Sequence, residues 1–317
     1  RVLFRSYGGF AKTRAIPIAS RRSSFPHPGI SPERGDNASR AIRHSHMNLP
    51  GYLRRIGFEA GVRPSPETLA ILLRCHVLSI PFENLDVQLG VPVTNDIDAA
   101  FEKIVGRGRG GWCYEQNGLF GWALSEIGFD VTRVAASVRR NQPNASGPAN
   151  HLCLLVRLPN HPETVYLADV GFGGSMIKPI RLEASQHEQA PFRIVLQQLD
   201  DGHWQFAEES AAGSVSYDFL AESGSESAMS ERCKRLQTDA DSSFVLNLVV
   251  QQRLPEAHVA LRGRVLTINT ASGKETRLLH TRDDLAETLR KAFRLDVPEA
   301  ADLWDRIVQR HAVLFDE

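Results

Sequence analysis

The spacing of apolar residues changes along the chain from a helical period to a strand-like one. From Met47 to Gly128, apolar residues recur every three or four positions, and Ser65 followed by Pro66 marks the start of one helix. Helices are predicted over residues 66–77, over 96–105, and from about 113 to just before 128. This part of the chain is therefore predicted to be a bundle of helices.

Beyond residue 129 the pattern becomes that of short strands, rich in β-branched and aliphatic residues. Strands are predicted over residues 131–138, 152–158, 165–170, 192–199, 204–206 and 215–219, and their spacing indicates an antiparallel sheet or barrel. The last third is mixed, with strands expected near 244–250 and 276–279, a hairpin across Arg262-Gly263, and helices over 283–293 and 299–308. Helices, then strands, then a mixed unit predict an α+β fold.

A chain of 317 residues, 42% of them hydrophobic, is long enough for two or three subdomains. We expect a helical domain over residues 47–129, a β-rich domain over 130–229 and an α/β lid domain over 230–317. Residues 1–46 hold nine basic and two acidic residues and are rich in Ser, Pro and Gly, which is typical of disorder. We expect this leader not to be native, with translation starting at Met47; a transit peptide and a basic nucleic-acid-binding arm are the alternatives.

Composition narrows the class of protein further. No apolar run approaches the roughly 20 residues that a membrane span needs. The four cysteines are scattered without a CxxC pair, which argues against a disulfide framework and a structural zinc site and suits a reducing compartment. We expect a cytoplasmic protein that needs no metal and binds neither membrane nor nucleic acid.

The stretch with the most chemical information is residues 109–115, RGGWCYE. Two glycines lead into Cys113, and an apolar helical pattern begins directly behind it. At a helix N-terminus, free backbone N–H groups and the helix dipole favour a thiolate over a thiol. Cys113 is therefore a candidate nucleophile, while Arg109 and Glu115 flank it and are expected to pair with each other and brace the loop.

A candidate base and a residue to orient it follow in order. His151 opens one predicted strand, and Asp169 closes the next, with turn residues 159–162 between the two strands. Antiparallel pairing of these strands would bring the two side chains together. The imidazole would take the Cys113 proton through one nitrogen while Asp169 holds the other in the right tautomer.

At these residues the chain resembles a known family, the arylamine N-acetyltransferases of bacterial type. The similarity runs in order from about Met47 to the C-terminus. It is carried by IPFEN (80–84), RGGWC (109–113), His151 with Leu152, ADVGFG (168–173), Ser243-Phe244 with Asn247, and LRGRVL (261–266).

The resemblance implies a fold, an activity and a set of binding residues. The fold would be an N-terminal helical bundle, a central antiparallel β-barrel or sheet and a C-terminal lid around a papain- or transglutaminase-like Cys-His-Asp core. The activity would be ping-pong transfer of an acetyl group from acetyl-CoA, as co-substrate, to an arylamine or arylhydrazine. The resemblance implies that Phe82 lines the acceptor pocket, and that CoA or substrate is bound by Arg109, Gly110, Gly111, Gly171, Phe172, Gly173 and Gly174.

Other functions would use the same three residues, Cys113, His151 and Asp169. A transglutaminase- or papain-like thiol hydrolase would pass the acyl group to water, and an amide synthase of the same superfamily would close an amide bond. A third alternative is a non-catalytic acyl-CoA-binding protein, but a protein that only binds would not need all three of these residues. From pattern alone, Phe82 is core, residues 171–174 are a turn needing positive φ, and Cys75 and Cys153 are packing residues. The protein is expected to be a monomer or homodimer.

Overall fold

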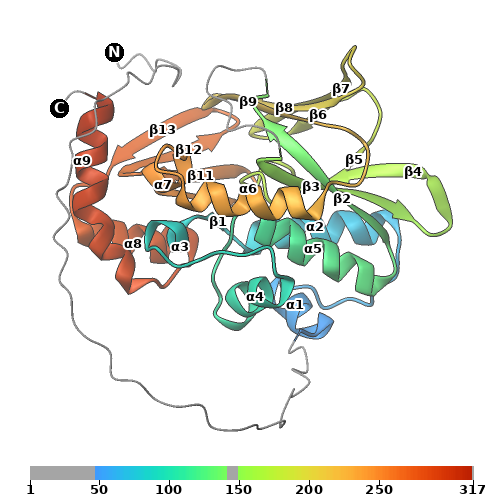
Figure 1. Cartoon of the computed structure of the whole chain (residues 1–317), viewed down its shortest axis with the longest axis horizontal. Helices are drawn as coiled ribbons and strands as arrows, with labels where there is room; N and C mark the ends of the chain where they lie inside the picture. Colours follow the sequence, from blue (N-terminus) through green and yellow to red (C-terminus); the bar gives the residue numbers. More distant parts are fainter. Residues whose placement is uncertain (1–46, 141–148, 316–317) are drawn as a thin grey trace, which may run out of the picture. The chain divides into compact units, whose positions relative to one another are not determined.

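Two antiparallel sheets with surrounding helices make up the part of the chain that this computed structural model describes, residues 47–140 and 149–315 (Figure 1). The predicted leader, residues 1–46, lies outside the described residues. An α+β chain with antiparallel sheets was predicted from the order of patterns and is confirmed.

Two helices before residue 128 were predicted with nearly the bounds that the structure has, α2 (Pro66–Ser79) and α5 (Cys113–Ile127). In α2, Ser65 Oγ accepts the Thr68 N–H at 3.2 Å, which caps the helix start. Helix α5 ends at Gly128, whose φ of 102° is in the left-handed region. The other helices here are α1 (Leu49–Arg55), α3 (Leu85–Gln88) and α4 (Ile97–Phe101).

One predicted helix has a different form. The range 96–105 holds α4 and then a π-helical turn, η1 (Glu102–Gly106). The sequence pattern cannot distinguish the two, because a π turn adds only one residue to the hydrogen-bonded ring. Such turns often occur near functional sites, and this one carries Lys103 into the interior.

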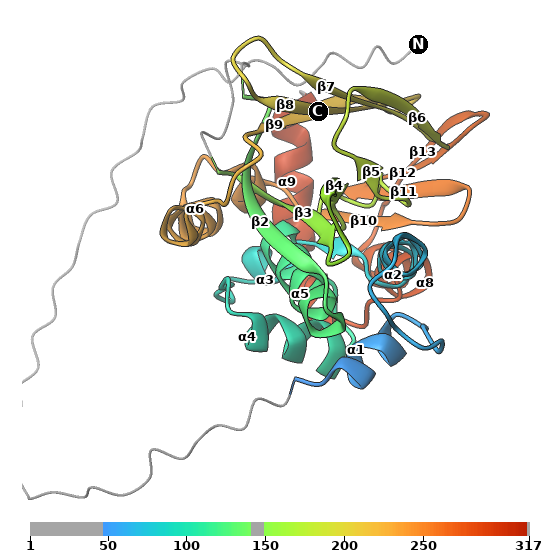
Figure 2. The ribbon, with the colours of Figure 1, turned by 90° about the vertical axis from the view of Figure 1, so that its right-hand side faces the viewer.

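The larger sheet has eight strands in the order β5-β4-β3-β2-β9-β8-β7-β6. These are β2 (Asp130–Val138), β3 (His151–Leu158), β4 (His161–Ala168), β5 (Ile180–Arg181), β6 (Ser185–Gln189), β7 (Phe192–Gln198), β8 (Trp204–Ser210) and β9 (Gly213–Phe219). Helix α5 contacts β2 and β3 (Figure 2). One hydrophobic core joins the helices to this sheet, from Tyr52 to Phe219.

The smaller sheet has the order β1-β10-β11-β12-β13. Its strands are β1 (Phe82–Glu83), β10 (Val249–Arg253), β11 (Ala257–Arg262), β12 (Val265–Thr270) and β13 (Gly273–Leu278). The predicted hairpin across Arg262-Gly263 is confirmed, since β11 and β12 pair there. Because β1 comes from the helical part, residues near 82 and 250 lie side by side.

The last third contains the largest departures from prediction. The predicted strand 244–250 begins as a short helix, α7 (Ser243–Leu246), and only its end belongs to β10. Helix α6 (Glu226–Thr238) was not predicted, because only Met229, Cys233 and Leu236 are buried in an otherwise polar stretch. Helix α8 (Arg282–Phe293) is confirmed, and the last predicted helix is a 3-10 turn, η2 (Pro298–Leu303), followed by α9 (Trp304–Phe315). The domain boundaries at 129 and 229 stay a prediction.

Candidate active site

Cys113 is the first residue of α5, as the sequence predicts, and its side chain is buried. The N–H groups of the first helical turn have no partner within the helix, so they and the helix dipole favour negative charge at this position. Cys113 is one of four free cysteines, together with Cys75, Cys153 and Cys233. It is the one of the four that stands at a helix N-terminus.

His151 and Asp169 are brought together by the β3–β4 hairpin. The strands pair with Leu154 opposite Ala168, which puts His151 at the start of β3 near Asp169, just beyond the end of β4. His151 Nε2 lies 2.7 Å from Asp169 Oδ2, and both side chains are buried. The predicted turn is shorter than expected, because β4 already begins at His161.

The electrostatics of this pair favour a charged imidazole. Burial alone would lower the pKa of His151, but the Asp169 carboxylate and the Cys113 sulfur raise it to about 10. Burial would likewise raise the pKa of Asp169, but His151 and two N–H donors hold it below its ordinary value. Cys113 interacts with the same imidazole, so one histidine lies between the sulfur and the carboxylate.

A fourth residue, Asn117, holds the carboxylate in place. Its Nδ2 donates to Asp169 Oδ1 at 2.8 Å and to the Leu152 carbonyl at 2.6 Å, while its Oδ1 accepts the Val170 N–H at 3.0 Å. The Gly171 N–H also donates to Asp169 Oδ1, at 2.9 Å. Asn117 was not predicted as a site residue, although it lies four residues after Cys113 and so on the same face of the helix.

Gly171, the first residue of the turn 171–174, approaches Cys113 too closely for a larger side chain. A Cβ on Gly171 would lie 2.7 Å from Cys113 Cα and 2.6 Å from Asn117 Nδ2. Gly173 and Gly174 have φ values of 91° and 89°, as the predicted turn requires. His258 Nε2 lies 2.8 Å from the Gly173 carbonyl oxygen, so β11 supports this turn.

Aromatic rings enclose His151 on the side of the larger sheet. Phe172 and Tyr217 lie 5.2 and 4.9 Å from its ring, measured between centroids. Phe172 and Tyr217 also contact each other at 4.8 Å. This packing holds the imidazole plane in one orientation.

A second apolar cluster surrounds Cys113 itself. Phe82 lies in it with Trp112, Tyr114 and Met229, and the rings of Phe82 and Phe244 are 6.3 Å apart. Phe82 is 8% exposed and thus belongs to the core as well as to the cluster that contains Cys113.

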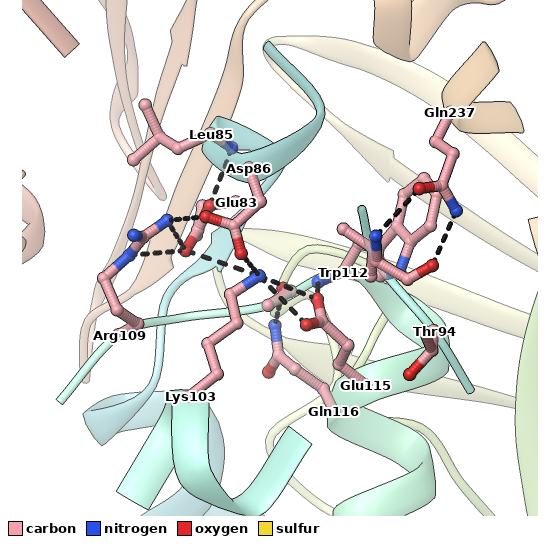
Figure 3. Close-up of polar contacts among 12 residues, drawn as sticks. Glu83, Leu85, Asp86, Thr94, Lys103, Arg109, Trp112, Glu115, Gln116 and Gln237 are labelled. Atoms are coloured by element: carbon pink, nitrogen blue, oxygen red, sulfur yellow. Dashed lines mark hydrogen bonds and ion pairs between the residues drawn. The ribbon is translucent and has the colours of Figure 1, made fainter. Parts of the chain in front are cut away.

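The loop before Cys113 is held by charged groups, but not as expected. Arg109 does not pair with Glu115: its guanidinium binds Glu83 at 2.8 Å and Asp86 at 2.9 Å, while Glu115 binds Lys103 at 2.9 Å (Figure 3). The prediction of an Arg109–Glu115 pair was therefore wrong. Adjacent Gly110 and Gly111 leave no room for a Cβ, which would lie 2.2 Å from the Pro81 carbonyl oxygen and 2.9 Å from Glu115 Oε2 respectively.

Within residues 47–140 and 149–315, no three His, Cys, Asp or Glu side chains form a group able to hold a metal ion. In that same part of the chain, no helix has the length and apolarity to cross a bilayer.

A thiol at a helix N-terminus beside a histidine–carboxylate pair, on an α+β scaffold, has the arrangement of a thiol-dependent acyl-transfer enzyme. Comparison with known proteins agrees. A family model described as N-acetyltransferase matches residues 66–302. The arylamine N-acetyltransferase of Mycolicibacterium smegmatis is 36% identical over 262 residues, covering 80% of this chain and 94% of the relative.

Solved structures are similar over the same extent. One arylamine N-acetyltransferase structure from M. smegmatis has a TM-score of 0.76 and 33% identity, and covers 83% of this chain and 98% of its own. That of Mycobacterium marinum in complex with CoA has a TM-score of 0.73 and 32% identity, with coverage of 83% and 98%. The chain belongs to the arylamine N-acetyltransferase family of acyltransferases.

Proposed function

We propose that this enzyme transfers the acetyl group of acetyl-CoA to an arylamine or arylhydrazine through an acetyl-Cys113 intermediate. The observation that carries the proposal is the 2.7 Å contact between His151 and Asp169 beside Cys113 at the start of α5. The CoA complex of the M. marinum relative supports acetyl-CoA as the donor.

In the first half-reaction, His151 takes the Cys113 proton, and the thiolate attacks the thioester carbonyl carbon. The bond from this carbon to the CoA sulfur breaks, and the departing thiolate receives the proton from His151. Backbone N–H groups, including that of Cys113, would bind the oxyanion, a contribution of about 3–4 kcal/mol to lowering the barrier.

In the second half-reaction, the amine nitrogen attacks the acetyl-Cys113 carbonyl carbon and loses a proton to His151. The carbon–sulfur bond breaks, the amide leaves, and the proton returns to the Cys113 sulfur. Asp169 remains ionised throughout, since its role is to orient His151 and stabilise the imidazolium.

The binding residues are proposed from their positions in the fold. Phe82 lies in the apolar cluster around Cys113 and is proposed to contact the aromatic ring of the acceptor. Gly171 passes next to Cys113, and Gly171, Phe172, Gly173 and Gly174 are proposed to line the CoA cleft. Gly110 and Gly111 lie in the loop that leads to Cys113 and are proposed to contact CoA or substrate there. Arg109 is proposed to act by holding this loop, because Glu83 and Asp86 bind its guanidinium.

The wider setting is proposed on the same basis. The core around the three polar residues is proposed to be papain- or transglutaminase-like, with residues 230–317 as the lid. All four cysteines are free, which supports a reducing cytoplasm as the site of action.

The test is to isolate the intermediate. Acetyl-CoA alone should add about 42 Da to the peptide containing Cys113, and varying both substrates should give parallel double-reciprocal lines. Cys113→Ser should remove both the adduct and turnover while the protein stays folded by circular dichroism. Intersecting lines with no acetyl-enzyme would contradict the proposal.

The same assay separates the alternatives. Release of CoA thiol that depends on the aromatic amine indicates the transferase. Release that continues without amine indicates a thiol hydrolase, and binding of acetyl-CoA without release indicates a binding protein. Cyclised product from a substrate carrying both amine and acyl groups would indicate the amide synthase.

A further inference from the structure

Five charged side chains lie together in the interior beneath the loop that leads to Cys113 (Figure 3). They come from four elements and this loop, and we call them the charge cluster: Glu83 of β1, Asp86 of α3, Lys103 of η1, Arg109 of the loop, and Glu115 of α5. Glu83, Lys103 and Glu115 are 0, 3 and 5% exposed. Removing charges from water is costly, and each of these groups offsets part of that cost by pairing with a group of opposite charge.

Lys103 connects the two halves of the cluster. Its Nζ lies 2.9 and 3.0 Å from the two oxygens of Glu115 and 2.9 Å from Asp86 Oδ2. Arg109 bridges Glu83 and Asp86 on the other side. The position of the Glu115 carboxylate is therefore fixed by a cation that is itself held by a second carboxylate.

Glu115 is the member of the cluster that contacts the backbone of the residue directly before Cys113. Its Oε2 accepts the Trp112 N–H, which belongs to the Gly111–Trp112 peptide, at 3.1 Å. Gly111 has no side chain where a Cβ would lie 2.9 Å from this oxygen. On the next residue, Gln116 Nε2 donates to the Gly111 carbonyl at 2.7 Å. The turn before Cys113 is thus held by two side chains of the helix that it starts.

We propose that Glu115 is a positioning residue for Cys113. The ionised carboxylate of Glu115, held by Lys103, fixes the backbone N–H of Trp112 and thereby holds the Cys113 sulfur against His151. The inference rests on the proposed role of Cys113 as the nucleophile. It adds that the reactivity of Cys113 depends on the charge of Glu115, and not only on His151 and Asp169.

Burial and the net charge of the cluster place the ionisation of Glu115 near neutral pH, where its effect on Cys113 can be measured. Three carboxylates face two cations, which leaves one negative charge in excess. The groups facing Glu115 are Lys103, Glu83 and Asp86 of the cluster, Arg109 behind them, and Cys233 of α6. Burial raises the pKa of Glu115 to about 7, and Lys103 limits the rise. A protonated Glu115 has the shape and zero charge of glutamine.

The experiment compares the enzyme with Glu115→Gln from pH 5.5 to pH 8.5. The readout is the rate at which iodoacetamide alkylates Cys113, measured by peptide mass spectrometry, so that no acetyl-CoA is needed. At the acid end the ratio of wild-type to variant rate should be near 1, because both side chains are neutral. The ratio should rise with pH through about 7 and level off at about tenfold or more, since a misplacement of 1 Å can cost about 100-fold.

Glu115→Gln should fold, because it leaves the cluster with two cations and two carboxylates. The matched control is Glu287→Gln, which removes the acid from an exposed Glu287–Lys291 pair on α8 and should give a ratio of 1 at every pH. Lys103→Met gives a second measurement, because Glu115 then has no lysine beside it. In this variant, the increase in the Cys113 alkylation rate that occurs near pH 7 in wild type should occur at higher pH.

Two outcomes would overturn the inference. A ratio of 1 at all pH values means that Glu115 does not position Cys113. A ratio that falls as pH rises means that the ionised carboxylate is not the form that positions it. Failure of the proposed function is recognised separately. In that case acetyl-CoA leaves no adduct on Cys113, whatever the alkylation rates show.

Discussion

Replacing Asp169 by asparagine tests the role of the carboxylate with almost no change in shape. The new amide must place its oxygen and its NH2 group at the two former oxygen positions. One position receives donors from Asn117 and Gly171, at 2.8 and 2.9 Å, so the amide oxygen has to take it. Asn117 cannot rotate to accept instead, because its own groups are engaged by Leu152 and Val170.

The NH2 group must therefore face His151 Nε2, now 2.7 Å from Asp169 Oδ2. Nε2 then has to accept, so the imidazole proton moves to Nδ1, on the side of the Cys113 sulfur. Losing a hydrogen bond to a charged group costs roughly 1.5–3 kcal/mol, a factor of about 10 to 100. The wrong tautomer adds to this, and we expect a loss of about 10⁴ in the rate of Cys113 acetylation, roughly 5 kcal/mol.

The assay for Asp169→Asn is single-turnover acetylation followed by intact mass spectrometry, with thermal melting to show that the fold is kept. Asp218→Asn is the matched control. Asp218 is also a buried carboxylate, bound to Arg140 at 2.7 Å, but it follows Tyr217 on β9 and so faces away from His151. A variant at Asp169 that keeps more than about a tenth of the wild-type rate would refute the tautomer argument.

Two further predictions concern packing and buried charge. Gly171→Ala should slow Cys113 acetylation at least about tenfold, because the new Cβ would lie 2.7 Å from Cys113 Cα. The control Gly61→Ala places its Cβ in open space and should leave the rate unchanged, so equal rates for the two variants would contradict this prediction. Burial raises the pKa of Glu208 to about 8, so the folded protein keeps a proton that the unfolded chain has released above its ordinary pKa of 4.5. The free energy of unfolding should therefore fall as pH rises between these values. In urea unfolding, the advantage of Glu208→Gln over wild type should grow by on the order of 1 kcal/mol per pH unit in this range. Below pH 4.5 this advantage must vanish.

The elements that carry the candidate site could be predicted because their signals are local. Cys113 follows two glycines and begins an apolar helix that ends at Gly128, and α5 has these bounds. His151 and Asp169 stand at the ends of two runs with strand periodicity separated by a turn, and the hairpin pairs them. In each case a few neighbouring residues determine the outcome.

Contacts between distant segments could not be predicted in the same way. The members of the charge cluster have no common period, so nothing local shows that Lys103 rather than Arg109 binds Glu115. The π turn that points Lys103 inward differs from an α-helix by hydrogen bonding, which the apolar pattern does not record. The run at 244–250 is β-branched and aliphatic, yet Ser242 caps a helical turn there and the Asn84 amide donates to the Phe244 and Asn247 carbonyls.

The hairpin that joins His151 to Asp169 also bears on how the site assembles. These two residues are separated by 18 positions and are brought together by one strand pairing, a contact of short sequence range. Cys113 reaches them only when α5 docks on β2 and β3. Contacts of short range close at lower entropic cost than distant ones, so the base and its carboxylate can form as a unit before the thiol arrives. During refolding, recovery of catalysis would then report the docking of α5 rather than the formation of the sheet.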